Sequence, residues 1–194
     1  TWFDLSGNGN DGTLVNGVGY STSNQGIMVY DGSNDYINLG QINNFSPEEI
    51  TIEITSKRKG NGGEEFACEI VRDNSFYFRL DKTSVEFRTW TSVTGDSGND
   101  SYGSFQFDKW YHMVARYDGS VKHVFLDGVK RPEEYFVSGN INSSSNNLII
   151  GGRRNGGLYI MDADIGIVRV YDRALSVDEI THNYNSEKSR YGIT

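Results

Sequence analysis

Oxygen-bearing side chains recur at alternate positions in a glycine-rich loop near the start of the sequence. The loop reads D-x-S-x-N-x-N-D-G, and its oxygen donors are Asp4, Ser6, Asn8 and Asn10. Hard oxygen ligands that are closely spaced in a tight loop suit Ca²⁺. Only Asp4 and Asp11 are charged, however, and no glutamate completes the set as a bidentate ligand. The pattern fits equally a structural turn whose side chains bond their own backbone, so both interpretations stay open.

A second group of acidic and amide residues occupies two other parts of the chain. Its members are Asp31, Asn34, Asp35, Asp162 and Asp164. We predict one Ca²⁺ ion as the cofactor. The first choice of ligands is Asp4, Asn8 and Asn10. The second choice is Asp31 and Asp35.

The carboxylates do not form the pair that hydrolysis of a glycosidic bond requires. Retaining glycosidases hold two carboxyl groups about 5–5.5 Å apart. The adjacent acidic pairs in this sequence are Glu64 with Glu65, Glu133 with Glu134, and Asp178 with Glu179. Neighbouring residues of a strand point to opposite faces, and Glu53 is expected to face solvent alone on its strand. We therefore predict that the protein is not an enzyme.

Histidine and serine give no catalytic set either. His112 and His123 could be cross-strand neighbours in one hairpin, and His182 is expected on a helix. We interpret the first two as packing residues on the surface or in the core. No serine lies in a G-x-S-x-G motif, so nucleophilic catalysis has no support.

Aromatic rings beside polar groups could bind a sugar, because the apolar face of a sugar ring can stack on an aromatic ring. The predicted ligand-binding residues lie in or beside expected loops: Trp90, Tyr102, Arg153, Arg154 and Tyr159. Trp110, Phe125 and Tyr171 are expected to pack in the core instead.

The composition restricts the possible partners. The chain has 194 residues and a formal net charge of −8. This charge is unfavourable for binding nucleic acid or an anionic membrane, and the basic run at residues 57–59 is expected in a solvated loop. No apolar run reaches the ~20 residues of a membrane-spanning helix. The chain opens at Thr1 within an apparent strand, and we expect residues 1–194 to form one domain of a longer polypeptide.

Alternating apolar residues predict many short strands. Residues 50–56 place Ile50, Ile52 and Ile54 on one face and polar residues on the other, which predicts a half-exposed strand. Asp-Gly turns at 118–119 and 127–128 separate apolar runs, which is typical of hairpins. We expect about twelve to fourteen strands in an antiparallel sandwich, a helical turn at residues 46–49 and a long loop at 92–104.

The C-terminal part predicts a strand followed by a short helix. Residues 165–171 carry apolar side chains on both faces of a strand. Ser176 and Glu179 then have the spacing of a capping box, and Leu175 and Ile180 that of a hydrophobic staple. We expect the helix to dock on the sandwich.

Several motifs together resemble the laminin G-like domains of the concanavalin A-like lectin/glucanase superfamily. They are D-L-S-G-N-G-N-D-G-T at 4–13, V-Y-D-G-S-N-D-Y at 29–36, the hairpin W-Y-H-M-V-A-R-Y-D-G-S-V-K-H-V-F-L-D-G-V at 110–129, and V-R-V-Y-D-R-A-L-S-x-x-E-I at 168–180. The resemblance implies an all-β, antiparallel jelly-roll sandwich of two curved sheets. Many such domains bind one calcium ion at the sandwich rim. Glucanases of the superfamily carry E-x-D-x-x-E or E-x-D-x-E on one strand, and neither motif occurs here.

The ending N-Y-N-S-E-K-S-R-Y-G-I at 183–193 looks like the variant of this domain in tailed-phage virion proteins. This implies a non-catalytic module of a capsid decoration, tail or fibre protein at the virion surface. Its expected partners are host-surface glycans or other virion subunits, and it could form homo-oligomers there. The alternative is a carbohydrate-binding module of a secreted, extracellular bacterial enzyme. A glucanase-like hydrolase is the least favoured hypothesis.

Overall fold

A computed structural model describes residues 1–42, 45–59, 66–81, 84–98, 100–102, 105–153 and 159–194. These residues form two eight-stranded sheets, and every strand pairing is antiparallel. The first sheet contains, in spatial order, β1 (Thr13–Val15), β4 (Tyr36–Asn38), β15 (Ile149–Ile150), β6 (Phe66–Arg72), β7 (Phe76–Asp81), β8 (Ser84–Thr91) and β10 (Asp100–Tyr102), with β9 (Gly95–Ser97) paired to β8. The second sheet contains β13 (Val129–Lys130), β12 (Val121–Leu126), β11 (Trp110–Tyr117), β5 (Ile50–Arg58), β16 (Asp162–Tyr171), β3 (Ile27–Asp31) and β2 (Gly19–Ser21), with β14 (Tyr135–Phe136) paired to β12.

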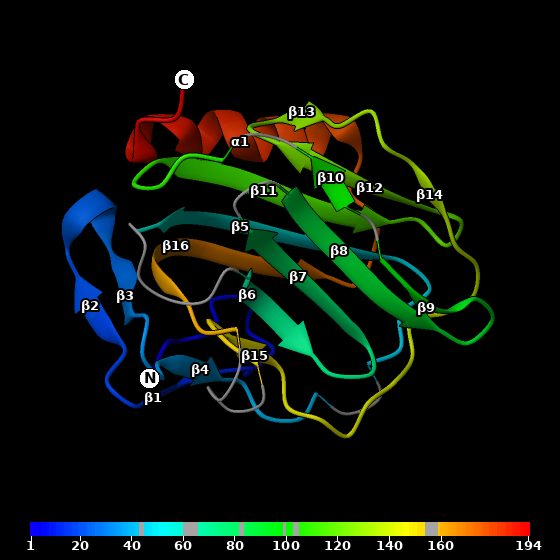
Figure 1. The fold of residues 1–194 in the computed structure, drawn as a ribbon, viewed down its shortest axis with the longest axis horizontal. Coiled ribbons are helices and arrows are strands. Elements are labelled where there is room, and N and C mark those ends of the chain that lie inside the picture. Colours follow the sequence, from blue (N-terminus) through cyan, green and yellow to red (C-terminus); the bar gives the residue numbers. More distant parts are fainter. Residues whose placement is uncertain (43–44, 60–65, 82–83, 99, 103–104, 154–158) are drawn as a thin grey trace.

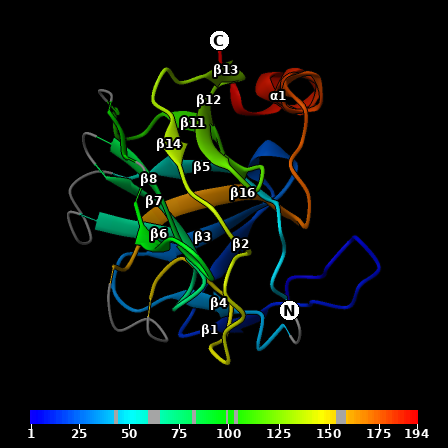
Figure 2. The same cartoon turned by 90° about the vertical axis from the view of Figure 1, so that its right-hand side faces the viewer.

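The two sheets pack face to face as layers (Figure 1). The α-helix of the described residues, α1 (Val177–Tyr191), lies on the side of the second sheet that faces away from the first (Figure 2). A single 3₁₀ turn, η1 (Ser23–Gln25), precedes β3. The predicted antiparallel sandwich with a C-terminal helix is therefore confirmed.

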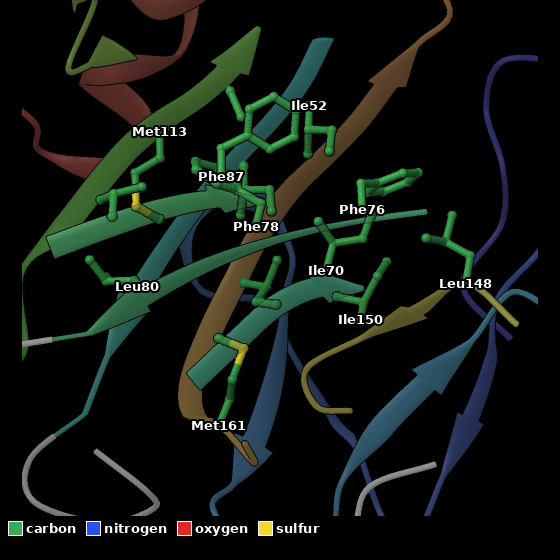
Figure 3. Packing of buried hydrophobic residues seen from close by; sticks show 14 of the residues in the cluster. Ile52, Ile70, Phe76, Phe78, Leu80, Phe87, Met113, Leu148, Ile150 and Met161 are labelled. Carbon is green, nitrogen blue, oxygen red and sulfur yellow. The ribbon is translucent and has the colours of Figure 1, made fainter. Parts of the chain in front are cut away.

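The core lies between the sheets and follows from the period-two pattern. Phe76, Phe78 and Leu80 point inward from β7, while Ile52 and Met113 point inward from the second sheet (Figure 3). Because alternate residues of a strand share one face, the intervening residues of β7 face outward. This second set of side chains lines the outer face of the first sheet.

The start of α1 agrees with its sequence signals. The Ser176 hydroxyl accepts a hydrogen bond from the Glu179 amide, and the Glu179 carboxylate accepts one from the Ser176 amide. Leu175 and Ile180 are both buried in one apolar cluster against the outer face of the second sheet. The predicted capping box, staple and docking helix are confirmed.

Several local expectations are wrong. Residues 46–49 contain a bend instead of a helical turn, and the described part of 92–104 carries β9 and β10 instead of a plain long loop. Lys57 and Arg58 belong to β5, and Arg58 is buried, donating to the Leu80 carbonyl. The register of β11 and β12 places Arg116 opposite His123, so His112 and His123 are not cross-strand neighbours.

The polar face of β5 is also buried, contrary to the expected half-exposed strand. Thr51, Glu53 and Thr55 are fully buried because α1 and the preceding chain cover this face of the second sheet. The alternation of the sequence correctly predicts the strand. The solvent exposure of its polar face, however, depends on a helix that lies more than 120 residues later in the chain.

One carboxyl group lies within the core between the sheets. Glu69 of β6 is fully buried, and its Oε1 accepts a hydrogen bond from the Ser56 hydroxyl of β5 at 3.1 Å. Burial raises the pKa of Glu69 to about 7, against the opposing effects of Arg58 and Ser56. The core therefore favours the protonated carboxyl.

We expect truncation of the staple to destabilise the fold. Ile180→Ala should lower the free energy of unfolding by about 2–4 kcal/mol, because it leaves a cavity in a buried cluster. Ser176→Ala should cost about 1 kcal/mol through loss of the helix cap. Val177→Ala is the control, since Val177 is 53% exposed. Urea denaturation measures all three, and an Ile180→Ala effect no larger than that of Val177→Ala would contradict the docking of α1.

Glu69 should make the protein less stable as the pH rises. Its pKa is higher in the folded than in the unfolded chain, so its contribution is complete below about pH 4.5 and is lost as the pH rises through about 7. In the wild type, we expect the free energy of unfolding to fall by up to about 3 kcal/mol between pH 5 and 8 because of Glu69. Glu69→Gln should abolish this fall. The control Glu48→Gln, at an exposed position, should leave the pH dependence unchanged. An identical pH profile for wild type and Glu69→Gln would contradict the raised pKa.

Candidate functional site

The outer face of the first sheet carries a cluster of aromatic and charged side chains. On the β7–β8 hairpin, Tyr77 lies opposite Arg88 and Arg79 opposite Glu86. These four residues alternate with the inward-facing residues of the same strands, so they share the outer face. Trp90, two residues after Arg88, continues the row and packs near Tyr77 with 5.9 Å between ring centroids. We call this surface the arginine–tyrosine face.

Glu86 holds the centre of the arginine–tyrosine face together. Its carboxylate forms ion pairs with the Nε of Arg79 at 2.5 Å and the Nε of Arg88 at 2.9 Å, and its Oε2 accepts the Tyr77 hydroxyl at 3.0 Å. The Glu86 side chain is only 1% exposed. Burial, and then the charge of Glu86, hold the pKa of Tyr77 well above its ordinary value, so its hydroxyl stays protonated and donates. One buried carboxylate thus fixes three neighbouring side chains.

Three guanidinium groups surround the ring of Tyr77. The Cζ atoms of Arg79, Arg88 and Arg153 lie 5.5, 5.7 and 5.6 Å from its centroid, within the range of cation–π contact. Tyr159 lies beside two of them, at 6.0 Å from Arg79 and 5.9 Å from Arg153. The result is a partly exposed layer in which guanidinium groups lie close to aromatic rings.

Two aspartates lie at the margin of the arginine–tyrosine face. Asp73 pairs with the Nε of Arg153 at 2.5 Å, and Asp96 of β9 pairs with the Nη1 of Arg88 at 3.2 Å. The Asp96 side chain is 47% exposed and that of Arg88 35%. The Asp96–Arg88 pair is therefore open to solvent, whereas the side chains of Asp73 and Arg153 are only 23% and 20% exposed.

Three of the five predicted ligand-binding residues meet on this face. Trp90, Arg153 and Tyr159 all contact the Tyr77 cluster. Tyr102 belongs to β10 of the same sheet, but its side chain lies outside the described residues, as does the whole of Arg154. Trp110, Phe125 and Tyr171 were expected in the core. Phe125 is fully buried in the apolar cluster beneath α1, as expected, whereas Trp110 and Tyr171 are only partly buried.

Sequence reasoning missed Tyr77, Arg79, Glu86 and Arg88. Their signal was present, because apolar residues alternate with them along both strands of a hairpin. The alternation of a half-buried strand predicts its outward-facing residues as well as its core residues. When two such strands are adjacent, their outward-facing residues lie side by side.

The predicted first calcium set forms a tight turn that uses its own backbone. The Asp4 carboxylate accepts hydrogen bonds from the amides of Ser6 at 2.8 Å and Asn10 at 3.0 Å, while Asp11 accepts from the Asp4 amide at 2.8 Å. The bonds from Ser6, and then that from the Asn10 amide, lower the pKa of Asp4. The Asn8 amide donates to the Ser6 hydroxyl. An ion bound by Asp4, Asn8 and Asn10 would have to share oxygens with these bonds.

The second acidic set is divided among several contacts. Asp35 accepts from the Asp31 amide at 3.2 Å, and burial raises its pKa despite this bond. Asp162 of β16 lies opposite Asp31 of β3 in the register of the two strands. Asp164 forms ion pairs with Lys57 at 3.0 Å and with Lys59 at 2.5 Å. Asp31 and Asp35 thus lie together in one turn, whereas Asp164 has basic partners.

A third acidic cluster lies beneath α1, where Glu53, His112 and Glu187 are close enough to share a metal ion. Arg169 already contributes a positive charge there: its Nη1 lies 3.3 Å from Glu53, and its Nη2 pairs with Glu187. Burial acts to raise the pKa of Glu53, but His112, Arg169 and Asn183 outweigh it and lower the pKa. We interpret this cluster as an ion-paired contact that holds the helix.

The sequence model of the concanavalin A-like lectin/glucanases superfamily matches residues 31–181. A search of curated protein sequences finds no match. In the described residues, no helix has the length and apolar character needed to cross a membrane.

Solved structures with the same fold include bacterial toxin domains and a domain of an extracellular enzyme. The receptor-binding domain of botulinum neurotoxin C/D mosaic serotype has a TM-score of 0.77 at 14% identity, over 95% of this chain and 48% of that one. The binding domain of Paraclostridial Mosquitocidal Protein 1 has a TM-score of 0.73 at 18% identity, over 95% and 49%. This chain spans about half the length of these toxin domains. Domain 4 of AbnA, a GH43 arabinanase from Geobacillus stearothermophilus solved with arabinotriose, has a TM-score of 0.72 at 16% identity, over 92% and 90%.

Calcium binding remains a prediction with a direct test. A site that binds only the folded chain raises its apparent stability, so the melting temperature should be higher in calcium than in chelator. Asp4→Ala should erase this difference if Asp4, Asn8 and Asn10 bind the ion, and Asp31→Ala should erase it if the second set does. Equal melting temperatures for the wild type in calcium and chelator would leave both as structural turns.

Proposed function

Because the chain belongs to the concanavalin A-like lectin/glucanases superfamily, we propose that it is a non-catalytic module that binds glycans through the arginine–tyrosine face. The observation that carries this proposal is the gathering of Tyr77, Trp90 and Tyr159 with three arginines on one outer sheet face. Tyr77 is itself buried, whereas the partly exposed rings of Trp90 and Tyr159 offer stacking surface to sugars. Guanidinium groups offer hydrogen-bond donors.

The other sheet supports this choice of surface. Part of the outer face of the second sheet is covered by α1, which buries Phe125 and Val114 there. In the described residues no helix covers the outer face of the first sheet, and Trp90, Tyr159, Arg79, Arg88 and Arg153 remain partly exposed. A rigid sheet also holds its side chains at fixed spacings, which lowers the entropic cost of binding.

A non-catalytic role is consistent with the state of the carboxylates on this face. Glu86 is buried and bound by two arginines and a tyrosine, while Asp73 and Asp96 each pair with an arginine. A general acid must exchange a proton with the substrate at close range. Carboxylates held in this way by arginines are poorly suited to that task.

For the biological setting, we propose a virion-surface module of a tailed phage, with host-surface glycans or other virion subunits as partners. Its support is the resemblance of residues 183–193 to virion proteins of tailed phages. On a particle, weak binding by one domain would become strong through many copies. A homo-oligomer of the chain would serve the same purpose.

A carbohydrate-binding module of a secreted enzyme is the second candidate. The observation that favours it is the match to domain 4 of AbnA, which this chain resembles over 90% of that domain's length. Sequencing the flanking polypeptide separates the two settings, since a catalytic domain supports the enzyme and a capsid or tail domain supports the phage.

We expect glycan binding to depend on the aromatic rings of the face. On an array of host-envelope polysaccharides and plant and animal oligosaccharides, an artificially multimerised form should bind more strongly than the monomer. Trp90→Ala and Tyr159→Ala should each weaken binding tenfold or more without changing the melting temperature by more than a few degrees. Phe136→Ala is the matched control, because Phe136 is 78% exposed on β14 of the second sheet.

The same oligosaccharides should not be hydrolysed by the protein, as measured by release of reducing ends. If both aromatic variants still bind the glycan as tightly as the wild type, the glycan must bind at a different surface. Binding of neither form to any glycan, together with tight binding to a purified virion protein, would replace the glycan-binding role by one in assembly.

A further inference from the structure

Resting on this glycan-binding role, we propose that the arginine–tyrosine face selects a sugar that carries a carboxylate, such as a uronic or sialic acid. The guanidinium group of Arg88 would receive the carboxylate, beside those of Arg79 and Arg153, and Trp90 and Tyr159 would contact the sugar ring. The proposal rests on which hydrogen-bonding groups the face offers to solvent.

The described side chains at the centre of the face offer mainly donors. Each guanidinium has five N–H groups and no acceptor. The carboxylate at the centre, Glu86, is 1% exposed and already contacts Arg79, Arg88 and Tyr77. A neutral sugar has hydroxyl protons that need acceptors, whereas a carboxylate has only oxygens that accept. The donor-rich centre therefore matches an acidic sugar better than a neutral one.

The arginines are held in place before any ligand arrives. Arg79 and Arg88 share Glu86, and all three arginines lie within 5.7 Å of the Tyr77 ring centroid. The planar fork of arginine fits a carboxylate with two parallel hydrogen bonds. Holding the guanidinium groups beside Tyr77 reduces the conformational freedom that binding must remove.

One of the two marginal aspartates, Asp96, leaves room for a competing carboxylate. Asp96 contacts Arg88 through one nitrogen at 3.2 Å and is 47% exposed. Such exposed ion pairs contribute little to stability, so a ligand carboxylate can replace Asp96 at small cost. Glu86 is buried and holds three partners, so it would stay in place and keep Arg79 and Arg88 in position.

The test compares acidic probes with neutral partners of the same sugar. The first pair is an oligogalacturonate and its methyl ester, and the second is 3′-sialyllactose and lactose. Binding is measured by NMR titration of the intact chain at low and at high salt. We expect at least one acidic probe to bind tenfold or more tightly than its neutral partner, with a preference that falls as salt rises.

Two substitutions should change this preference in opposite directions. Arg88→Gln should reduce binding of the acidic probe to near that of its neutral partner. Asp96→Asn should strengthen acidic binding several-fold, because it removes the competing carboxylate. Asp172→Asn makes the same charge change at an exposed position after β16, and it should have little effect.

The outcomes distinguish this inference from the proposed glycan-binding role. Equal binding of acidic and neutral partners, or a neutral glycan bound while no acidic probe binds, would overturn acidic selection and leave glycan binding standing. An acidic preference that Arg88→Gln and Asp96→Asn leave unchanged would also overturn it, because the carboxylate would then bind elsewhere. If no glycan of any kind binds, both the inference and the proposed role fail.

Discussion

The buried carboxylate of Glu53 is the interaction on which the arrangement of the layers depends. It lies 2.6 Å from the Nε2 of His112, accepts a hydrogen bond from Asn183 at 3.0 Å and pairs with Arg169 at 3.3 Å. These partners come from β11, α1 and β16, so one charge connects two neighbouring strands and the helix. Removing one partner of a buried ion pair typically costs about 3–5 kcal/mol, because the remaining charge is left without compensation. The helix is thus held where it covers the second sheet.

This docking determines which surface remains for recognition. The second sheet has apolar clusters and the Glu53 contacts beneath α1, whereas the outer face of the first sheet presents partly exposed rings and guanidinium groups. Each sheet contains a buried carboxylate on its outer face, but the partners differ. Glu53 contacts groups that hold α1 on the second sheet, while Glu86 pairs with Arg79 and Arg88, which remain partly accessible. The first arrangement stabilises the fold, and the second positions side chains on an exposed face.

The sequence predicted the strands and the helix better than the surroundings of their outward residues. β8, β11 and β12 agree with the alternation of their residues, and the cap at Ser176 agrees with its local motif, because both signals depend on nearby residues. Glu53 was expected in solvent, since no local pattern shows that Asn183 and Glu187 will cover it. The arginine–tyrosine face was found only in part, because strand register, and not spacing in the sequence, brings Tyr77 and Arg79 of β7 opposite Arg88 and Glu86 of β8.

The central claim is that the arginine–tyrosine face is where a glycan binds. The most direct measurement is an NMR titration of isotopically labelled protein with the tightest-binding oligosaccharide, followed at the Trp90 indole, the Nε–H groups of Arg79 and Arg88, and all backbone amides. The account predicts that the largest shifts occur at these side chains and at the amides of β7 and β8. Shifts confined to the Asp4–Asp11 turn or to α1, with the Trp90 and arginine signals unchanged, would contradict it.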